Sequence, residues 1–169
     1  MWCVIQVFTG QEEKMRSACI KYIDSDVLEE TFIPKRIRRR KYLGTWRDEE
    51  CALFPGYVFL VTEKPDELHD QLRRVEGMTK LLRDESSVLM LTHEEEEFMK
   101  TLGDSEHVTQ MSIGIIEGKT IRITEGPLIG LEGMIRKIDR HKRQCIVETD
   151  MFGQKTKMTV GLEIISKFI

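Results

Sequence analysis

The sequence predicts an α+β domain followed by a small β-barrel. In residues 1–103, apolar stripes at helical spacing alternate with short runs rich in β-branched and aromatic residues. Residues 117–169 have no helical stripe and contain short apolar pairs separated by turn signals, the pattern of four or five short strands. The polar stretch between the two regions lacks periodicity, so residues 104–116 are the expected linker.

The first region begins with an apolar run typical of a buried strand. Trp2–Phe8 is apolar on both faces except at Gln6, as expected for a central strand covered by helices. A helical stripe follows between Met15 and Ile23, and further strands are expected at residues 30–40 and 52–61.

Two more helices are marked by their first turns. Pro65 and the acids after it suit a helix start, and the stripe that follows stops at Gly77. A short strand is expected at residues 88–91. Thr92 and Glu95 have the spacing of a capping box before the last helix. The order β-α-β-β-β-α-β-α predicts a mostly antiparallel sheet.

The second region is divided by turn signals at Gly126-Pro127, residues 139–143 and Phe152-Gly153. The apolar stretch at residues 111–116 has two readings, an extra strand on the barrel or a surface that docks the barrel on the first domain. The apolar pairs that predict barrel strands are Ile121/Ile123, Ile135/Ile138, Cys145/Val147 and Met158/Val160.

Charge is unevenly distributed along the 169 residues. The chain has 26 Lys+Arg and 29 Asp+Glu, a net charge of −3. Residues 117–169 hold ten basic and seven acidic residues, a net +3, which leaves −6 for residues 1–116. No apolar run reaches the roughly 18 residues that span a bilayer, and the first residues do not resemble a signal peptide. Four cysteines without a Cys-x-x-Cys pair indicate reduced thiols, so we expect a cytoplasmic protein.

Catalytic and metal-binding motifs are missing from the sequence. The four histidines do not cluster with each other or with cysteine, and no nucleophile elbow, phosphate-binding loop or dinucleotide fingerprint occurs. The acids at 94–97 suit capping and solvation better than metal binding. We therefore expect a protein that is not an enzyme and needs no cofactor or metal.

The densest charge cluster is Lys35–Lys41, with six cations in seven residues. Along a strand these cations would occupy both faces, so we expect a hairpin that projects into solvent. Such a local positive field suits a polyanion backbone, and we favour nucleic-acid contact over a hairpin that only increases solubility.

A second basic cluster lies at a predicted strand and turn of the barrel. Basic loops on small barrels commonly follow a phosphate backbone, and we favour RNA contact over a merely solvated turn. Only Phe152 and Phe168 could stack on bases in this region, which favours recognition of phosphates and duplex shape. The candidate RNA-binding residues are Arg136, Lys137, Arg140, His141, Lys142, Arg143 and Lys155.

An aromatic cluster spans Leu53–Phe59 around Pro55-Gly56. Such a cluster is most often core, but Pro followed by Gly forces a bend, which places some rings on an exposed patch suited to a protein partner.

Two sets of motifs resemble the NusG family of transcription factors. Residues 117–169 resemble its KOW domain in Ile121-x-Ile123, Gly126-Pro127-Leu128, Gly133 and Phe152-Gly153-Gln154-Lys155-Thr156. The first region resembles the amino-terminal (NGN) domain of the family in Trp2-x-Val4-x-Gln6-Val7-x-Thr9-Gly10-x-Glu12, Phe54-Pro55-Gly56-Tyr57-Val58 and Gly77.

This resemblance implies a ferredoxin-like NGN domain over residues 1–103 and an SH3-like KOW barrel over residues 117–169. It also implies a factor, expected to be a monomer, that holds the RNA polymerase clamp closed and so disfavours pausing and termination. By motif position the clamp helices would contact Gln6, Phe8, Phe54, Pro55 and Tyr57, the gate loop would contact Leu68, His69 and Asp70, and DNA would lie near Arg38, Arg39, Arg40 and Lys41.

The KOW region departs from the housekeeping member of the family. Gln154–Thr159 stands where that member usually has Arg-x-Thr-Pro-Val-Glu, and Leu128 stands where that member often has Phe. With the basic cluster, these changes resemble a specialised paralog of the LoaP type, an antiterminator that recognises an RNA hairpin in the leader transcript. Two alternatives remain open: a general NusG-type elongation factor whose KOW domain couples to Rho or the ribosome, and a KOW protein of the translation machinery.

Overall fold

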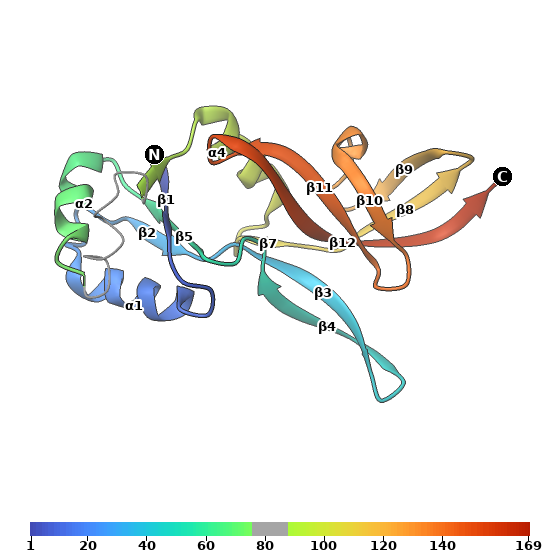
Figure 1. Cartoon of the computed structure of the whole chain (residues 1–169), viewed down its shortest axis with the longest axis horizontal. Coiled ribbons are helices and arrows are strands. Elements are labelled where there is room, and N and C mark those ends of the chain that lie inside the picture. The colour runs from blue at the N-terminus through green and yellow to red at the C-terminus, as the bar shows by residue number, and fades with distance from the viewer. Residues whose placement is uncertain (76–87) are drawn as a thin grey trace. The chain divides into compact units, whose positions relative to one another are not determined.

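A computed structural model describes residues 1–75 and 88–169 (Figure 1). The predicted helix stop at Gly77 lies outside the described residues. The chain divides into two compact units: unit one is Met1–Pro34 with Phe54–Glu96, and unit two is Lys35–Leu53 with Glu97–Ile169.

Unit one is built on a four-stranded antiparallel sheet in the order β2-β5-β1-β6. The central strand β1 (Trp2–Gln6) is buried up to Ile5, as its apolar run predicts. It pairs with β5 (Tyr57–Val61) and β6 (Val88–Met90), and β5 also pairs with β2 (Glu30–Phe32). The predicted mostly antiparallel sheet is therefore confirmed.

Two helices, α1 (Glu12–Tyr22) and α2 (Pro65–Leu72), contribute to the core on one side of this sheet. Both begin with acids in the first turn, which favours the positive end of the helix dipole. The core side chains they share with the sheet include Cys3, Ile5, Met15, Cys19, Val58, Leu60, Leu68 and Leu72.

The last helix, α4 (His93–Leu102), starts at the predicted capping box. The Thr92 backbone N–H donates to Glu95 Oε2 at 2.9 Å, and the Glu95 N–H donates to Thr92 Oγ1 at 3.2 Å. These reciprocal bonds satisfy two backbone donors that a helix start otherwise leaves unpaired.

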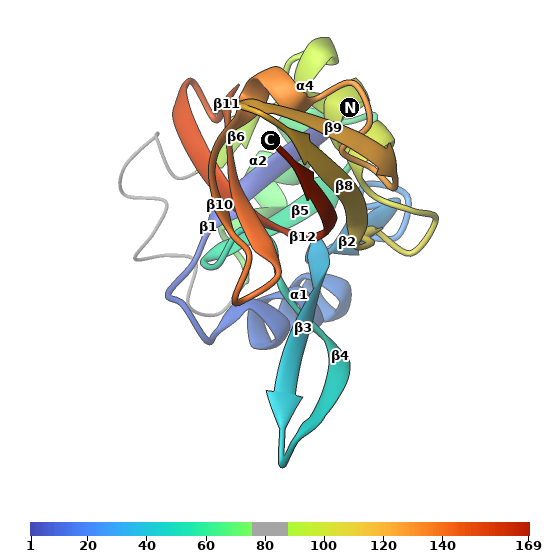
Figure 2. The ribbon, with the colours of Figure 1, turned by 90° about the vertical axis from the view of Figure 1, so that its right-hand side faces the viewer.

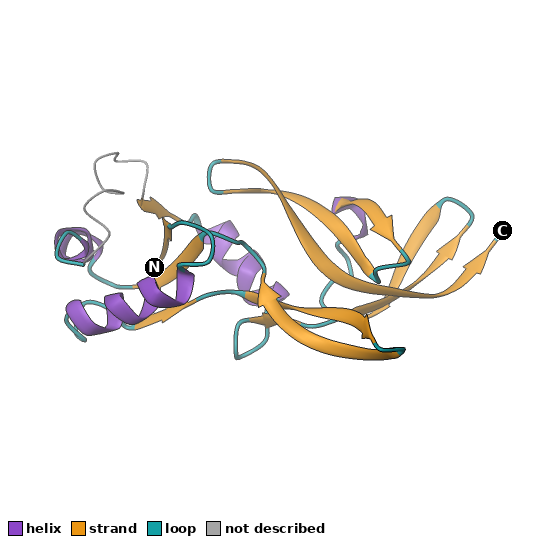
Figure 3. Cartoon of the chain, turned by 60° about the horizontal axis from the view of Figure 1, so that its bottom comes forward, coloured by secondary structure: helices purple, strands orange, loops and turns teal. Residues whose placement is uncertain are grey.

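Unit two contains a five-stranded sheet in the order β10-β11-β12-β8-β9 (Figure 3). Its pairs are antiparallel except for β8 beside β12. The strands are β8 (Ser112–Glu117), β9 (Thr120–Glu125), β10 (Ile135–Asp139), β11 (Gln144–Met151) and β12 (Gln154–Phe168), with a short 3-10 helix, η2 (Glu132–Met134), before β10.

Unit two also contains the basic hairpin, β3 (Lys35–Tyr42) and β4 (Thr45–Ala52), with β7 (Val108–Thr109) beside β3. Figure 2 shows the hairpin extending away from the five-stranded sheet. Its two-residue turn has φ of 48° at Leu43 and 80° at Gly44. Positive φ at both positions matches the twist of a tight hairpin, and glycine accommodates it without strain.

The range expected to be a linker has secondary structure. β7 lies within it, and most of β8 (Ser112–Glu117) does too. Of the two readings of residues 111–116, the structure shows the added strand, because β8 pairs with both β12 and β9. The boundaries predicted for the two domains stay a prediction.

Three of the four cysteines are core residues. Burial raises the pKa of Cys3, Cys19 and Cys145 to about 12, so each is a protonated thiol at neutral pH. Within residues 1–75 and 88–169, no group of acids, histidines and cysteines is arranged to hold a metal ion. No described helix is both long enough and apolar enough to cross a membrane.

Candidate functional site

The exposed surface at one end of the unit-one sheet, called the Phe8 patch below, consists of Gln6, Phe8, Pro55 and Tyr57. Gln6 and Tyr57 are paired across β1 and β5, and Phe8 and Pro55 lie in the loops just beyond. The Phe8 ring is 74% exposed, while Tyr57 is half-buried. An aromatic side chain held in solvent at a sheet end is the kind of feature that protein partners use.

Glu12 holds the two loops of the patch together. Its Oε2 accepts the Gly10 N–H at 2.9 Å, and its Oε1 accepts the Gly56 N–H at 2.8 Å. Val7 adds a backbone bond to the Gly56 carbonyl at 2.7 Å. Gly56 has a φ of 86°, and an added Cβ would lie 3.1 Å from the Val7 carbonyl oxygen, so a larger residue would push the loops apart.

The ionised form of Glu12 is favoured in the folded chain. Partial burial acts to raise its pKa, but hydrogen bonds from its own backbone N–H and those of Gly56 and Gly10 outweigh burial and hold the pKa below its ordinary value. The clamp therefore depends on a charged carboxylate. This explains physically why Gly10, Glu12 and Gly56 occur together in the motifs.

Two residues expected on the polymerase-facing surface are buried instead. Phe54 is only 4% exposed, and its ring stacks on Phe59 with centroids 6.2 Å apart. Leu68 is 1% exposed and belongs to the helix–sheet core. Phe54 therefore takes the core position, one of the two that the sequence left open, and its contact with the clamp helices stays a prediction. Of the α2 residues expected near the gate loop, His69 is half-buried and Asp70 is exposed.

The arginines of the β3–β4 hairpin are largely paired with acids on the opposite strand. Arg38 Nε donates to Glu49 at 2.7 Å, and Arg39 Nε donates to Asp48 at 2.8 Å. Arg40 lies 3.5 Å from the same Glu49. Glu49 and Asp48 face Arg38 and Arg39 in the strand register, and these acids reduce the positive field of the cluster.

Lys41 and Arg36 are hairpin cations that lack such acidic partners among the described residues. Lys41 forms no ion pair among the described residues. Arg36 is half-buried, and its Nη1 is the buried side-chain nitrogen without a hydrogen-bond partner in the described part of the chain. Burial lowers the pKa of Arg36 below its usual value, and neighbouring Arg38 adds to this effect. A buried unpaired guanidinium nitrogen is costly and is satisfied by an anion.

Some residues of the predicted RNA-binding cluster are held by hydrogen bonds or ion pairs, and the others are not. Arg136 is held by the Gly133 carbonyl at 2.7 Å and Glu148 at 3.7 Å, and Lys155 lies 3.2 Å from Asp150. Four other cluster members, Lys137, Arg140, His141 and Lys142, are exposed, and their side chains form no hydrogen bond or ion pair with another described residue.

Arg143 links the barrel to the hairpin within unit two. Its guanidinium carbon lies 3.8 Å from the centre of the Trp46 ring on β4, and its Nη1 lies 3.5 Å from Glu163 on β12. The other Glu163 oxygen accepts from Arg39 at 2.6 Å. One carboxylate therefore holds an arginine from each basic cluster.

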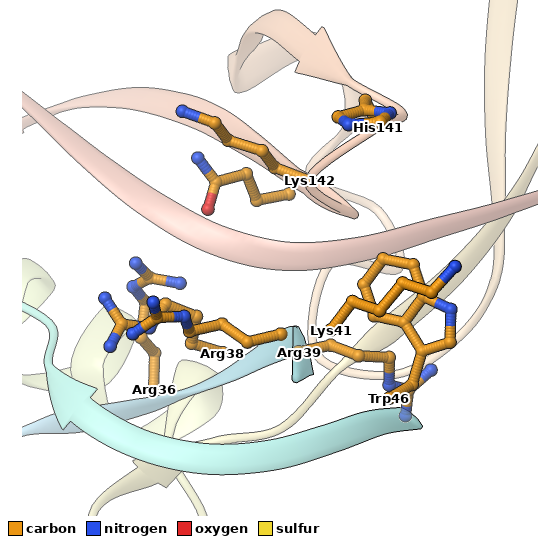
Figure 4. A pocket seen from close by; sticks show the side chains of 9 residues that line it. Arg36, Arg38, Arg39, Lys41, Trp46, His141 and Lys142 are labelled. Atoms are coloured by element: carbon orange, nitrogen blue, oxygen red, sulfur yellow. The ribbon is translucent and has the colours of Figure 1, made fainter. Parts of the chain in front are cut away.

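The hairpin and the β10–β11 turn consequently enclose one groove. This cavity, called the basic groove below, has a volume of about 470 Å³. Figure 4 shows the hairpin arginines along one wall and Lys142 and His141 along the other, with Trp46 at one end. Trp46 was not a sequence-based candidate. The available signal was a tryptophan within a highly charged hairpin.

The two units differ more in net charge than residues 1–116 and 117–169 do. Unit two has 18 Lys+Arg and 13 Asp+Glu, a net +5. Unit one has 8 and 16, a net −8. The acidic unit carries the apolar Phe8 patch, and the basic unit carries the groove.

Residues 1–100 match the protein-family model described as "Transcription termination factor nusG". The chain belongs to the NusG family. The fold class predicted from the sequence, α+β with an NGN domain and a KOW domain, agrees with this membership. NusG proteins are transcription factors that act with RNA polymerase, and the family is not an enzyme family.

Curated relatives match along nearly the whole chain. The "Transcription termination/antitermination protein NusG" of Pasteurella multocida is 25% identical over 98% of this chain and 94% of its own length. The protein of the same name from Bacillus subtilis is 25% identical over 98% and 97%, and that from Lactococcus lactis is 26% identical over 97% and 91%.

A solved structure titled "Domain interaction in Thermotoga maritima NusG" is 22% identical, with a TM-score of 0.49, and the match covers 95% of this chain and 92% of that one.

Proposed function

We propose that this NusG-family chain is a processive antitermination factor. Its NGN domain binds RNA polymerase, and its basic KOW region binds an RNA hairpin in the nascent leader transcript, which suppresses pausing and termination. The observation that carries the proposal is the group of exposed cations without ion pairs at β10 and the β10–β11 turn, Lys137, Arg140 and Lys142, with the exposed His141 beside them.

The Phe8 patch supports the polymerase half of the proposal. Phe8 is exposed, and the Glu12 clamp fixes the loops on either side of it. A preorganised apolar surface loses little conformational entropy when a helical partner covers it. By family resemblance the partner is the clamp helices, while His69 and Asp70 on α2 would face the gate loop and the hairpin would lie near DNA.

The charge pattern of unit two supports the RNA half. Free lysines and arginines release counterions when they meet phosphates, whereas a cation already paired with an acid gains less. Lys157 is also exposed at the start of β12, where the housekeeping member usually has a different residue. These features favour the LoaP-type paralog.

In vitro transcription through a terminator, with and without a structured leader in the template, tests this function. The proposal expects readthrough only when the leader is transcribed. Arg140→Glu with Lys142→Glu should abolish that readthrough while polymerase binding stays intact. Lys14→Glu with Lys21→Glu on α1 changes the net charge equally and should leave readthrough unchanged. Leader-independent readthrough by the native protein contradicts the proposal.

A general elongation factor is the second candidate function. The relatives named termination/antitermination protein NusG match along nearly their whole length, which favours a similar general role. This candidate expects an effect on every template and a KOW domain that captures Rho or a ribosomal protein but not structured RNA.

A further inference from the structure

The basic groove combines three features that the two clusters do not have separately. Its cations come from both walls, since Arg36 and Lys41 are on the hairpin and Lys142 is on the β10–β11 turn. No acidic residue is among those that line it. The groove also has an aromatic wall, because Trp46 of β4 faces the same space.

Three of the six cations that line the groove are not neutralised by acids of the described residues, whereas Arg38, Arg39 and Arg40 are ion-paired. Arg36 Nη1 is buried without a hydrogen-bond partner in the described residues, and Lys41 and Lys142 form no ion pair there. A guanidinium offers a planar set of donors that fits phosphate oxygens, and each ammonium group adds a point charge. Three positive charges around one cavity therefore leave a place for several anionic groups spaced along a chain.

Trp46 supplies the contact that the barrel lacks. The ring is 37% exposed, and Arg143 lies against it at 3.8 Å. A base stacked on an indole contributes about 1–3 kcal/mol, and every base has a face that can stack. Sequence analysis predicted recognition of duplex shape because the barrel has few aromatic residues. The hairpin changes that expectation by bringing Trp46 to the groove.

Glu163 sets the spacing of the two walls. It accepts Arg39 of the hairpin at 2.6 Å and lies 3.5 Å from Arg143 of the barrel. It is not one of the residues lining the cavity, so its charge holds the walls without occupying the binding space. The separation of the walls is thus fixed before a ligand arrives, which lowers the entropy cost of binding.

From this arrangement we infer that the basic groove binds an unpaired segment of RNA, with phosphates at Arg36, Lys41 and Lys142 and a base stacked on Trp46. The inference rests on the proposed function and refines it, because it gives the factor a single-stranded contact beside the duplex contact at Lys137 and Arg140. A cavity of about 470 Å³ holds a segment of one or two nucleotides and is too small for a duplex. An acidic peptide would use the cations but would leave the indole without a stacking partner.

Tryptophan fluorescence tests this inference directly in the full-length protein. The chain has two tryptophans, and Trp2 is 7% exposed in the core of unit one, so a ligand in the groove acts on Trp46. The probe is a single-stranded RNA of about 12 nucleotides. We expect it to quench the fluorescence, and we expect Trp46→Phe to remove the quench with little loss of affinity. Trp46→Ala should weaken binding about tenfold or more.

The charged wall is tested with neutral variants. Lys142→Gln should weaken binding of the single strand and reduce its salt slope by about 0.7, and Arg36→Gln should act in the same direction. Arg36 is half-buried, so the exposed Lys142 provides the result if the Arg36 variant is unstable. Arg122→Gln, which removes an exposed arginine of β9 that is paired with Glu117, is the matched control and should bind as the native protein does.

The outcomes separate this inference from the function it refines. Binding of a leader hairpin without quenching, and with equal affinity in Trp46→Ala, overturns the groove assignment but leaves the proposed function standing. Failure of both RNAs to bind overturns both. Polyglutamate that binds as tightly as the single strand at the same salt concentration shows a site for acidic protein and also overturns the inference. Quenching by RNA that is lost in the Trp46 and Lys142 variants supports it.

Discussion

The Phe8 patch and the basic groove use acidic side chains in opposite ways. In the patch, Glu12 binds backbone N–H groups, so its charge fixes loop geometry and leaves the surface apolar. In unit two, Asp48, Glu49 and Glu163 bind arginine side chains, so their charges reduce the positive field at some positions and leave it at others. The number of cations in a cluster is therefore a poor measure of its binding strength. The cations that lack partners decide where a polyanion can bind.

The largest effect is expected at the core beneath the patch. Phe54→Asp buries a carboxylate in place of a ring that stacks on Phe59, and it should cost at least the 3–5 kcal/mol typical of losing a buried Phe. Thermal unfolding followed by circular dichroism should show a much lower midpoint or an unfolded chain.

Phe8→Asp is the matched change at an exposed position. Because the Phe8 ring is 74% exposed, unfolding stability should stay within about 0.5 kcal/mol while polymerase binding is lost. A stable Phe54→Asp protein would show that this ring is not part of the core.

The next effect is the salt dependence of RNA binding. If only the five unpaired cations of the groove and the β10–β11 turn (Arg36, Lys41, Lys137, Arg140 and Lys142) meet phosphates, the log–log slope should be about −3 to −4. Fluorescence anisotropy between low and physiological salt measures it. A slope steeper than about −7, which is the value for all ten cations of unit two that form no ion pair with a described residue, would mean that the paired arginines also contribute and would remove the distinction drawn between the two kinds of cation.

A smaller effect is expected at the clamp. Glu12→Gln keeps the shape of the side chain but replaces charge-assisted hydrogen bonds with weaker ones, which should cost about 1 kcal/mol of stability and reduce polymerase binding. Chemical denaturation and a polymerase pull-down measure the two effects.

The pH dependence of this variant has a definite sign. The folded-state pKa of Glu12 is depressed, so its stabilising contribution is complete above the unfolded-state pKa of about 4.3 and is lost as pH falls through the lower folded-state value. The difference in stability between native protein and Glu12→Gln should therefore shrink with acidification. A difference that stays constant down to pH 3 would contradict an ionised clamp.

The smallest effect is expected from Glu163→Gln. The change removes one negative charge near the groove, which favours RNA, and weakens the link between its walls, which opposes binding. We expect a net change in affinity of about threefold or less. A loss of RNA affinity as large as that expected for Trp46→Ala would show that the distance between the groove walls matters more than the local electrostatic field.

Local patterns predicted the parts of the fold that depend on neighbouring residues. The buried run of β1 and the capping box of α4 are examples, because a strand pattern or helix cap is read over a few positions. The strand at residues 112–117 could not be predicted in the same way, since it is stabilised by pairing with residues of β12 that lie 50 or 51 positions further along the chain.

The candidate site was also hard to predict from the sequence, because its contacts join residues that are far apart along the chain. The contact of Arg39 with Glu163 joins residues 124 positions apart, and no local pattern brings Trp46 to Arg143. The inward position of Phe54 was also ambiguous, because a Pro-Gly bend can turn a ring to either side.

Gly161 on β12 allows the β3–β4 hairpin to lie close to this strand. An added Cβ there would lie 3.0 Å from the Ile37 carbonyl oxygen of the hairpin and would also collide with Met111. A single methyl group at this position would thus displace the arginine-bearing arm while leaving every charged side chain unaltered. Related proteins can therefore differ in the ligand they prefer because of a substitution at this one position, even when all their charged residues are the same.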